Sequence, residues 1–142
     1  MNTLPNIVNS RILYDSTEKA VIQLVGYYTA ACTAANLKVV TANALYFGNT
    51  SQTCLVAVEK IQYEGSLNGF VSLDWIGAAN TSFFVMKNGA GMMEGAMFND
   101  ATTPTGDINA RTYNVNANDA FTITLSLRKI QGYSNGTVWF DQ

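Results

Sequence analysis

The sequence predicts an all-β protein, folded as a single β-sandwich or jelly-roll-like domain. The first observation is an unbroken alternation of apolar and polar side chains over residues 119–129. Its apolar positions are Phe121, Ile123, Leu125 and Leu127. A period of two is typical of a strand with one face in a core and the other in water or against a partner. The second observation is a series of short β-branched and aromatic runs, separated by Gly and Asn turns and without a convincing helical pattern.

Length and composition restrict the class of function. A chain of 142 residues fits one domain and can bury about 68% of the surface of its unfolded form. Histidine is absent, which removes Ser-His-Asp and Cys-His catalysis, and we expect no enzyme. Charged residues make up only 13% of the chain, so a largely neutral surface is available for contact with a protein or a sugar. The net charge of −2 and eight scattered Lys and Arg provide no basic stripe for nucleic acid.

The first third of the chain predicts an arm, three strands and one helical turn. The arm is residues 1–10, the strands are 11–15, 20–28 and 37–40, and the turn is 41–45. The segment 29–36 contains four alanines that favour a helix, but it is short and weakly amphipathic, so we expect a loop.

The middle of the chain predicts a long strand at residues 54–63. Val56 and Val58 are expected on one face, and Leu55, Ala57, Ile61 and Tyr63 on the other. Apolar residues on both faces indicate a central strand that is covered twice. A hairpin-like connection at 64–69, a strand at 70–75, a turn at 77–81 and a strand at 82–86 are expected to follow.

Residues 87–107 are rich in Gly, Met, Asn and Thr and predict a long loop, which in a compact domain is usually functional or mobile. Four residues in it form an adaptable apolar set, Met92, Met93, Met97 and Phe98. This set could pack under its own loop or against a partner.

The last part of the chain predicts two strands and an extension. The strands are residues 108–115 and 119–129, joined by a turn at 116–119, and the extension is 130–142. The extension could return as an edge strand through an Asn135-Gly136 turn. It could equally donate Trp139 and Phe140 to a neighbour. The sandwich core is therefore expected over residues 11–129.

Groups able to carry chemistry form no recognisable site. Four carboxylates could meet as a glycosidase pair, but each is explained more simply as a solvated strand end or turn: Glu59, Glu64, Asp74 and Glu94. Six oxygen-bearing residues could bind calcium, but they lack EF-hand spacing and turn formation accounts for them: Asp100, Asp107, Asn109, Asn116, Asn118 and Asp119. No metal and no cofactor is expected.

Cys32 and Cys54 are not spaced as a metal pair. We expect two buried thiols in a reducing compartment rather than a disulfide, because Cys54 opens an apolar run. The N-terminus lacks the pattern of a signal peptide, and no run has the length of a membrane span.

Four segments, taken in their order and spacing, resemble small virion structural proteins of tailed bacteriophages, especially those infecting marine bacteria and cyanobacteria. The segments are residues 16–24, 54–63, 106–108 and 119–129. The similarity covers most of the chain, from about Arg11 to Lys129, and the sequence departs from it in the Met-containing loop and after Lys129.

The resemblance implies a non-enzymatic virion protein, with a capsid decoration or cement protein as the leading role. Assembly in the host cytoplasm, binding to the major capsid protein or other virion proteins, and a homo-oligomer are the expectations that follow. Nucleic acid and membrane are not expected as partners. Candidate partner contacts are Leu4, Ile7, Met92, Met93, Met97, Phe98, Trp139 and Phe140.

The alternative is a tail- or fibre-associated module for host adhesion that binds carbohydrate. Seven aromatic residues could supply stacking faces, namely Tyr27, Tyr28, Tyr46, Trp75, Tyr113, Tyr133 and Trp139. The competing interpretation is that most of them fill the core. An exposed aromatic residue beside Asn and Asp would favour the sugar-binding role.

Overall fold

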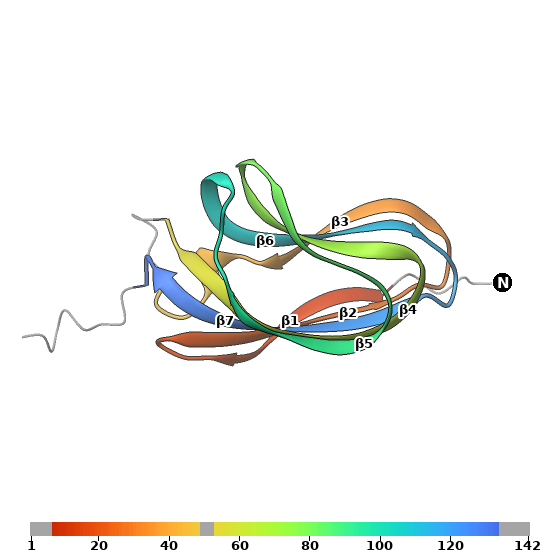
Figure 1. Ribbon diagram of the computed structural model, residues 1–142, viewed down its shortest axis with the longest axis horizontal. Coiled ribbons are helices and arrows are strands. Elements are labelled where there is room, and N and C mark those ends of the chain that lie inside the picture. The colour runs from red at the N-terminus through yellow and green to blue at the C-terminus, as the bar shows by residue number, and fades with distance from the viewer. Residues whose placement is uncertain (1–6, 49–52, 134–142) are drawn as a thin grey trace, which may run out of the picture.

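Nearly all of the described chain is extended. The computed structural model describes residues 7–48 and 53–133, and Figure 1 shows their strands in two layers. The elements are β1 (Ile7–Asp15), β2 (Lys19–Tyr27), β3 (Cys32–Val40), the 3-10 turn η1 (Ala42–Ala44), β4 (Leu55–Ala79), β5 (Thr81–Met97), β6 (Thr102–Val115) and β7 (Ala120–Gln131). The all-β prediction is confirmed.

All strands pair antiparallel, and two of them run through both layers. Residues 55–66 of β4 pair with β7 and with residues 88–97 of β5. Residues 70–79 of β4 pair with β6, and residues 71–75 pair with 81–86 of β5. The first layer therefore has the order β1-β2-β7-β4-β5, and the second has the order β3-β6-β4-β5.

The strand β4 crosses between the layers where its regular pairing is interrupted, between Ser66 and Val71. Two side chains accept hydrogen bonds from backbone N–H groups that lose their strand partners at this interruption. Leu67 N donates to Asn88 Oδ1 at 2.8 Å, and Asn68 N donates to Asp119 Oδ2 at 2.9 Å. These bonds remove the cost of unpaired buried donors, which lets one strand serve two layers.

The core lies between the two layers and follows the predicted alternation. Phe121, Ile123, Leu125 and Leu127 of β7 are all buried, as the sequence predicts. They meet the inner residues of β4 and β6, among them Trp75, in one cluster. A strand with period-two patterning thus lines one wall of the sandwich.

The predicted hairpin connection at residues 64–69 is wrong, because these residues continue β4. Its glycines mark close approach of backbones instead of a turn. A Cβ at Gly69 would stand 1.6 Å from the carbonyl oxygen of Tyr113, and one at Gly65 would stand 2.9 Å from that of Ala120. Glycine is therefore required where β4 passes its neighbours.

The predicted loop at residues 87–107 is also wrong, since only residues 98–101 lie between β5 and β6. Antiparallel pairing with β4 supplies hydrogen-bond partners for the backbone of the Gly- and Met-rich segment. This pairing outweighs the weak strand propensity of that segment. The turn at 77–81 is shorter than expected, with Asn80 Oδ1 accepting from Gly77 N at 3.1 Å.

Other boundaries also differ from the expectations. Residues 7–10 of the predicted arm pair with β2, so only residues 1–6 of it lie outside the described chain. Strand β3 begins at Cys32, within the predicted loop. A register shift between Val58 and Lys60 turns Ile61 to the same inner face as Val58, not the opposite one. The helical turn predicted at 41–45 is confirmed as η1.

Candidate interaction surface

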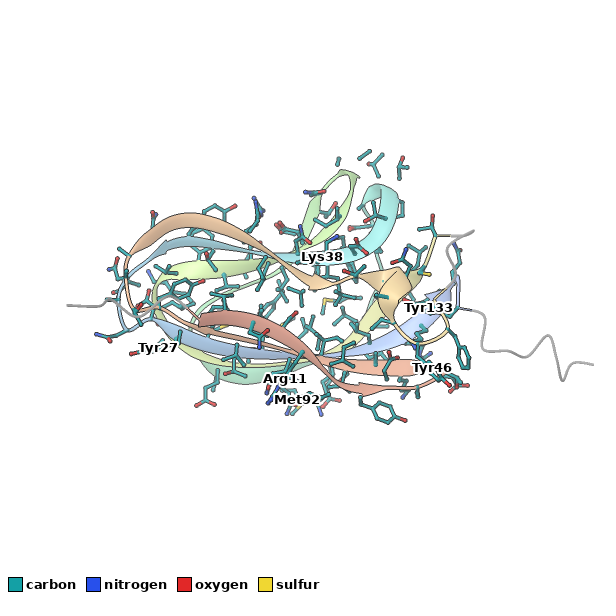
Figure 2. All side chains as sticks on the ribbon, turned by 180° about the vertical axis from the view of Figure 1, so that it is seen from behind. Arg11, Tyr27, Lys38, Tyr46, Met92 and Tyr133 are labelled. Atoms are coloured by element: carbon teal, nitrogen blue, oxygen red, sulfur yellow. The ribbon has the colours of Figure 1, made fainter. Side chains whose placement is uncertain are left out.

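The outer face of the first layer carries neutral and charged side chains in rows set by strand register. Charged residues lie on the rows beside the central one, namely Lys19, Lys60, Glu64, Glu94 and Arg128. The central row is Arg11, Gln23, Thr124, Gln62 and Met92. Figure 2 labels the residues at its two ends, Arg11 and Met92. Arg11 Nη2 donates to Gln23 Oε1 at 2.8 Å, so the cation is held within the face. Covering this central row alone requires little desolvation of charge.

β1 forms one edge of this layer, and three successive large apolar residues are exposed on it. The exposed fractions are 54% for Ile12, 48% for Leu13 and 56% for Tyr14. The pairing with β2 shifts register between Ile12 and Tyr14, which places a β-bulge at Leu13. A bulge redirects side chains and discourages addition of another strand at an edge. Ile12 lines a hollow with Lys38 and Val39 of β3, whereas Tyr14 lines a separate hollow with Lys19 and Glu59.

Tyr46 extends this exposed run. Its backbone N–H donates to Oδ2 of Asp15, the residue after Tyr14, at 2.7 Å, and the residue is 53% exposed. The ring stacks on Phe47 with 3.9 Å between centroids. Ile12, Leu13, Tyr14 and Tyr46 are called here the apolar edge patch.

Lys129 of β7 connects Asp15 and Tyr46 at this end of the sandwich. Its side chain is 2% exposed, and Nζ donates to Asp15 Oδ1 at 2.6 Å and to the carbonyl oxygen of Tyr46 at 2.8 Å. Nζ also lies 5.8 Å from the ring centroid of Tyr46 and 5.1 Å from that of Tyr133. Figure 2 places both labelled tyrosines at the same end of the molecule. A single buried ammonium therefore joins β7, the end of β1 and the segment after η1.

The outer face of the second layer holds a different feature, a buried carboxylate network. Asp74 is 1% exposed and is bonded by the Arg111 guanidinium, by Ser72 Oγ at 2.9 Å and by Ser82 Oγ at 2.7 Å. Burial alone would raise the pKa of Asp74, but hydrogen bonds from Ser82, Arg111 and Ser72 together hold it below its ordinary value. Arg111 also lies over the ring of Tyr113. The network ties β5 and β6 to β4.

The four carboxylates considered for catalysis do not meet in one place. Glu59 and Glu94 line one hollow of about 460 Å³ together with Lys19 and Lys60, whereas Glu64 and Asp74 lie elsewhere. Glu59 is paired with Arg128 at 2.7 Å and Lys19 at 3.7 Å, and Glu94 lies opposite Lys60 across β4 and β5. Glu64 is exposed on the outer face of the first layer. The expectation that all four are solvated is wrong for Asp74, which lies within a strand and needs its partners because it is buried.

Two of the six oxygen-bearing residues considered for calcium, Asp107 and Asp119, accept hydrogen bonds within the protein. Within the described residues, Asn109 Oδ1 is buried without a hydrogen-bond partner. Asp107 accepts from Lys38 Nζ at 2.9 Å and from Ala42 N at 2.8 Å. Asp119 accepts from Asn116 N at 2.9 Å, which supports the predicted turn. Across the described residues, no three His, Cys, Asp or Glu side chains come together as a metal site. Cys54 is buried, with its Sγ 3.2 Å from the carbonyl oxygen of Gly132.

The predicted partner contacts are dispersed. Met92 and Met93 project to opposite faces of β5 and are exposed, while Met97 packs against the core. Phe98 is exposed after the end of β5. Ile7 begins β1. Three further contacts lie outside the described residues, namely Leu4, Trp139 and Phe140.

The candidate aromatic stacking faces are divided between core and surface. Tyr28 and Trp75 are buried, whereas Tyr27 and Tyr46 are exposed. Tyr27 lines a hollow of about 690 Å³ on the outer face of the first layer, and its hydroxyl lies 3.4 Å from Asn118 Oδ1. Gly26, Gly65, Glu64 and Thr122 also line the hollow.

Sequence reasoning missed the apolar edge patch, although a signal was present. Residues 11–15 were expected to form a short strand, yet Ile12, Leu13 and Tyr14 break the alternation of that strand. Three consecutive apolar residues between Arg11 and Asp15 require either burial on both faces or a partner.

Comparison with known proteins identifies no family. No protein-family model matches the chain, and no curated protein matches it. Among solved structures, a cupin superfamily protein from Desulfitobacterium hafniense is similar over 92% of this chain and 84% of its own, with a TM-score of 0.32 and 13% identity. In the part of the chain that the structure describes, no helix is long and apolar enough to cross a membrane.

Proposed function

We propose that this chain is a non-enzymatic virion structural protein of a tailed bacteriophage, and that it decorates or cements the assembled head. The observation that carries the proposal is the apolar edge patch, because Ile12, Leu13 and Tyr14 are exposed in succession on a bulged edge. The partner is the major capsid protein or a neighbouring virion protein, and the protein resides in the virion after assembly in the host cytoplasm.

Two further features support docking through this patch. Lys129 and Asp15 hold Tyr46 beside the end of β1, so the patch requires little ordering when it binds. Tyr14 and Tyr46 are of a residue type that is enriched among binding hot spots. The neighbouring outer face, with its polar and charged side chains, can form the rim of the contact.

Purified protein added to heads that lack it tests the proposal. We expect saturable binding at a fixed number of symmetric sites, measured by co-sedimentation and quantitative gel analysis. Heads that bind no protein, or that bind it without saturation, would contradict a decoration role.

The second candidate is a carbohydrate-binding module, and the Tyr27 hollow favours it. Tyr27 supplies an aromatic face at the hollow, and Glu64 and Thr122 supply hydrogen-bonding groups. Sugars are commonly held by such a pairing of an apolar face with polar groups. A glycan array with wild type and Tyr27→Ala separates the two roles: ligands lost in the variant would establish sugar binding.

A further inference from the structure

The second edge of the first layer, residues 88–94 of β5, has a free backbone. Over the described residues, β5 pairs with β4 alone, and every residue from 87 to 96 is exposed. The register with β4 is regular from Asn88 to Glu94 and shifts only after Glu94. An edge of this length with unpaired N–H and C=O groups is a template for another strand.

We propose that this edge pairs antiparallel with the same segment of a second copy, about a two-fold axis at Gly91. The two first layers would then form one continuous sheet. Self-pairing of β5 is independent of head binding and requires no other protein.

Size complementarity selects the second copy as the occupant. Small residues occupy the first half of the segment and large residues the second half. In this register the opposed pairs are Asn88 with Glu94, Gly89 with Met93, Ala90 with Met92, and Gly91 with itself. Each large side chain of one copy therefore meets a small or amide side chain of the other.

Polar complementarity selects the antiparallel direction. Asn88 already uses Oδ1 to accept from Leu67 N at 2.8 Å, so its amide N–H groups can donate to the partner's Glu94 carboxylate. A parallel arrangement would instead bring Glu94 against Glu94.

Analytical ultracentrifugation of the full chain, without heads, tests the pairing. Wild type is expected to form a dimer, and Ala90→Lys or Met92→Glu alone is expected to weaken it by about tenfold or more. An equimolar mixture of the two variants should recover dimer, because the introduced lysine of one copy faces the introduced glutamate of the other. Val85→Lys, at an exposed position in the other half of β5, is the matched control and should leave the dimer unchanged.

Cross-linking tests the register. A mixture of Ala90→Cys and Met92→Cys variants should form a covalent dimer under mild oxidation, whereas each variant alone should not. A monomeric wild type would overturn the proposal. So would a dimer that all the substitutions leave unchanged, or cross-linking by Ala90→Cys alone, which would place the axis at Ala90. Circular dichroism verifies that each variant is folded.

Discussion

The two edges of the first layer present different groups to a partner. β1 exposes large apolar side chains at a bulge, whereas β5 exposes a regular backbone beneath small and flexible side chains. The same sheet can therefore make two kinds of contact. Side-chain docking suits β1, and strand addition suits β5.

The edges are also fixed in place differently. The end of β1 is held by the buried ammonium of Lys129, while β5 depends on the crossing of β4, which Asn88 and Asp119 stabilise. Substitutions at these supporting residues should therefore affect one edge without affecting the other.

The largest effect is expected for Lys129→Met. Removing the ammonium leaves the Asp15 carboxylate half-buried without its cation, which should lower the free energy of unfolding by about 3 kcal/mol. Urea unfolding at pH 7 measures this change. The matched control is Lys19→Met, whose ion pair with Glu59 is exposed and should change stability by about 0.5 kcal/mol or less. Equal effects of the two substitutions would contradict the role of Lys129.

Leu13→Asp is expected to act on binding rather than on folding. Because Leu13 is half-exposed, the variant should stay folded, but a charge in the apolar edge patch should weaken binding to heads by about tenfold to a hundredfold. Co-sedimentation across a range of protein concentrations gives the affinity. Val85→Asp, on the second layer, serves as control, and an equal loss there would show that the binding surface is not specific to β1.

Asp119→Asn should reduce stability by about 1–2 kcal/mol, because charged acceptors hold the β4 crossing more strongly than an amide does. Burial acts to raise the pKa of Asp119, but hydrogen bonds from Asn116 and Asn68 lower it overall. Its contribution is therefore present above the unfolded pKa of about 3.9 and is lost as pH falls through the lower folded value.

Urea unfolding of wild type and Asp119→Asn at pH 7, 4 and 3 checks this dependence. The difference in stability between the two proteins should shrink as the pH falls. A constant difference would show that the carboxylate charge is not involved.

The smallest effect is expected for Gly89→Ala on β5. The position has open space, but its φ of +109° disfavours a residue with a side chain, so we expect a loss of about 1 kcal/mol. Thermal unfolding compares it with Ala96→Gly, also exposed on β5. If Gly89→Ala is not destabilising, the glycine conformation does not shape this edge.

The sequence predicted the fold class because burial on one face imposes a period of two, as in Phe121 to Leu127. It did not reveal that β4 crosses both layers. Glycine is favoured both in turns and where two backbones approach closely, so the sequence does not distinguish these two roles for Gly65 and Gly69. Only the three-dimensional arrangement shows why Asp74 is buried, because its partners Ser82 and Arg111 come from other strands.

The candidate surface was partly predictable. A neutral row on β7 follows from its threonines and serine, but the neighbouring strands place Lys19, Lys60 and Glu64 beside it. The apolar edge patch did not follow, because exposure of Ile12 and Leu13 depends on the bulge and on the position of β1 at the edge. Period and composition carry no information about which strand is outermost.

Electron cryomicroscopy of heads saturated with the protein tests the central claim most directly. We expect symmetric density for the sandwich, with Ile12, Leu13, Tyr14 and Tyr46 against the shell. Heads without such density, or with the sandwich bound while the β1 edge faces solvent, would contradict it.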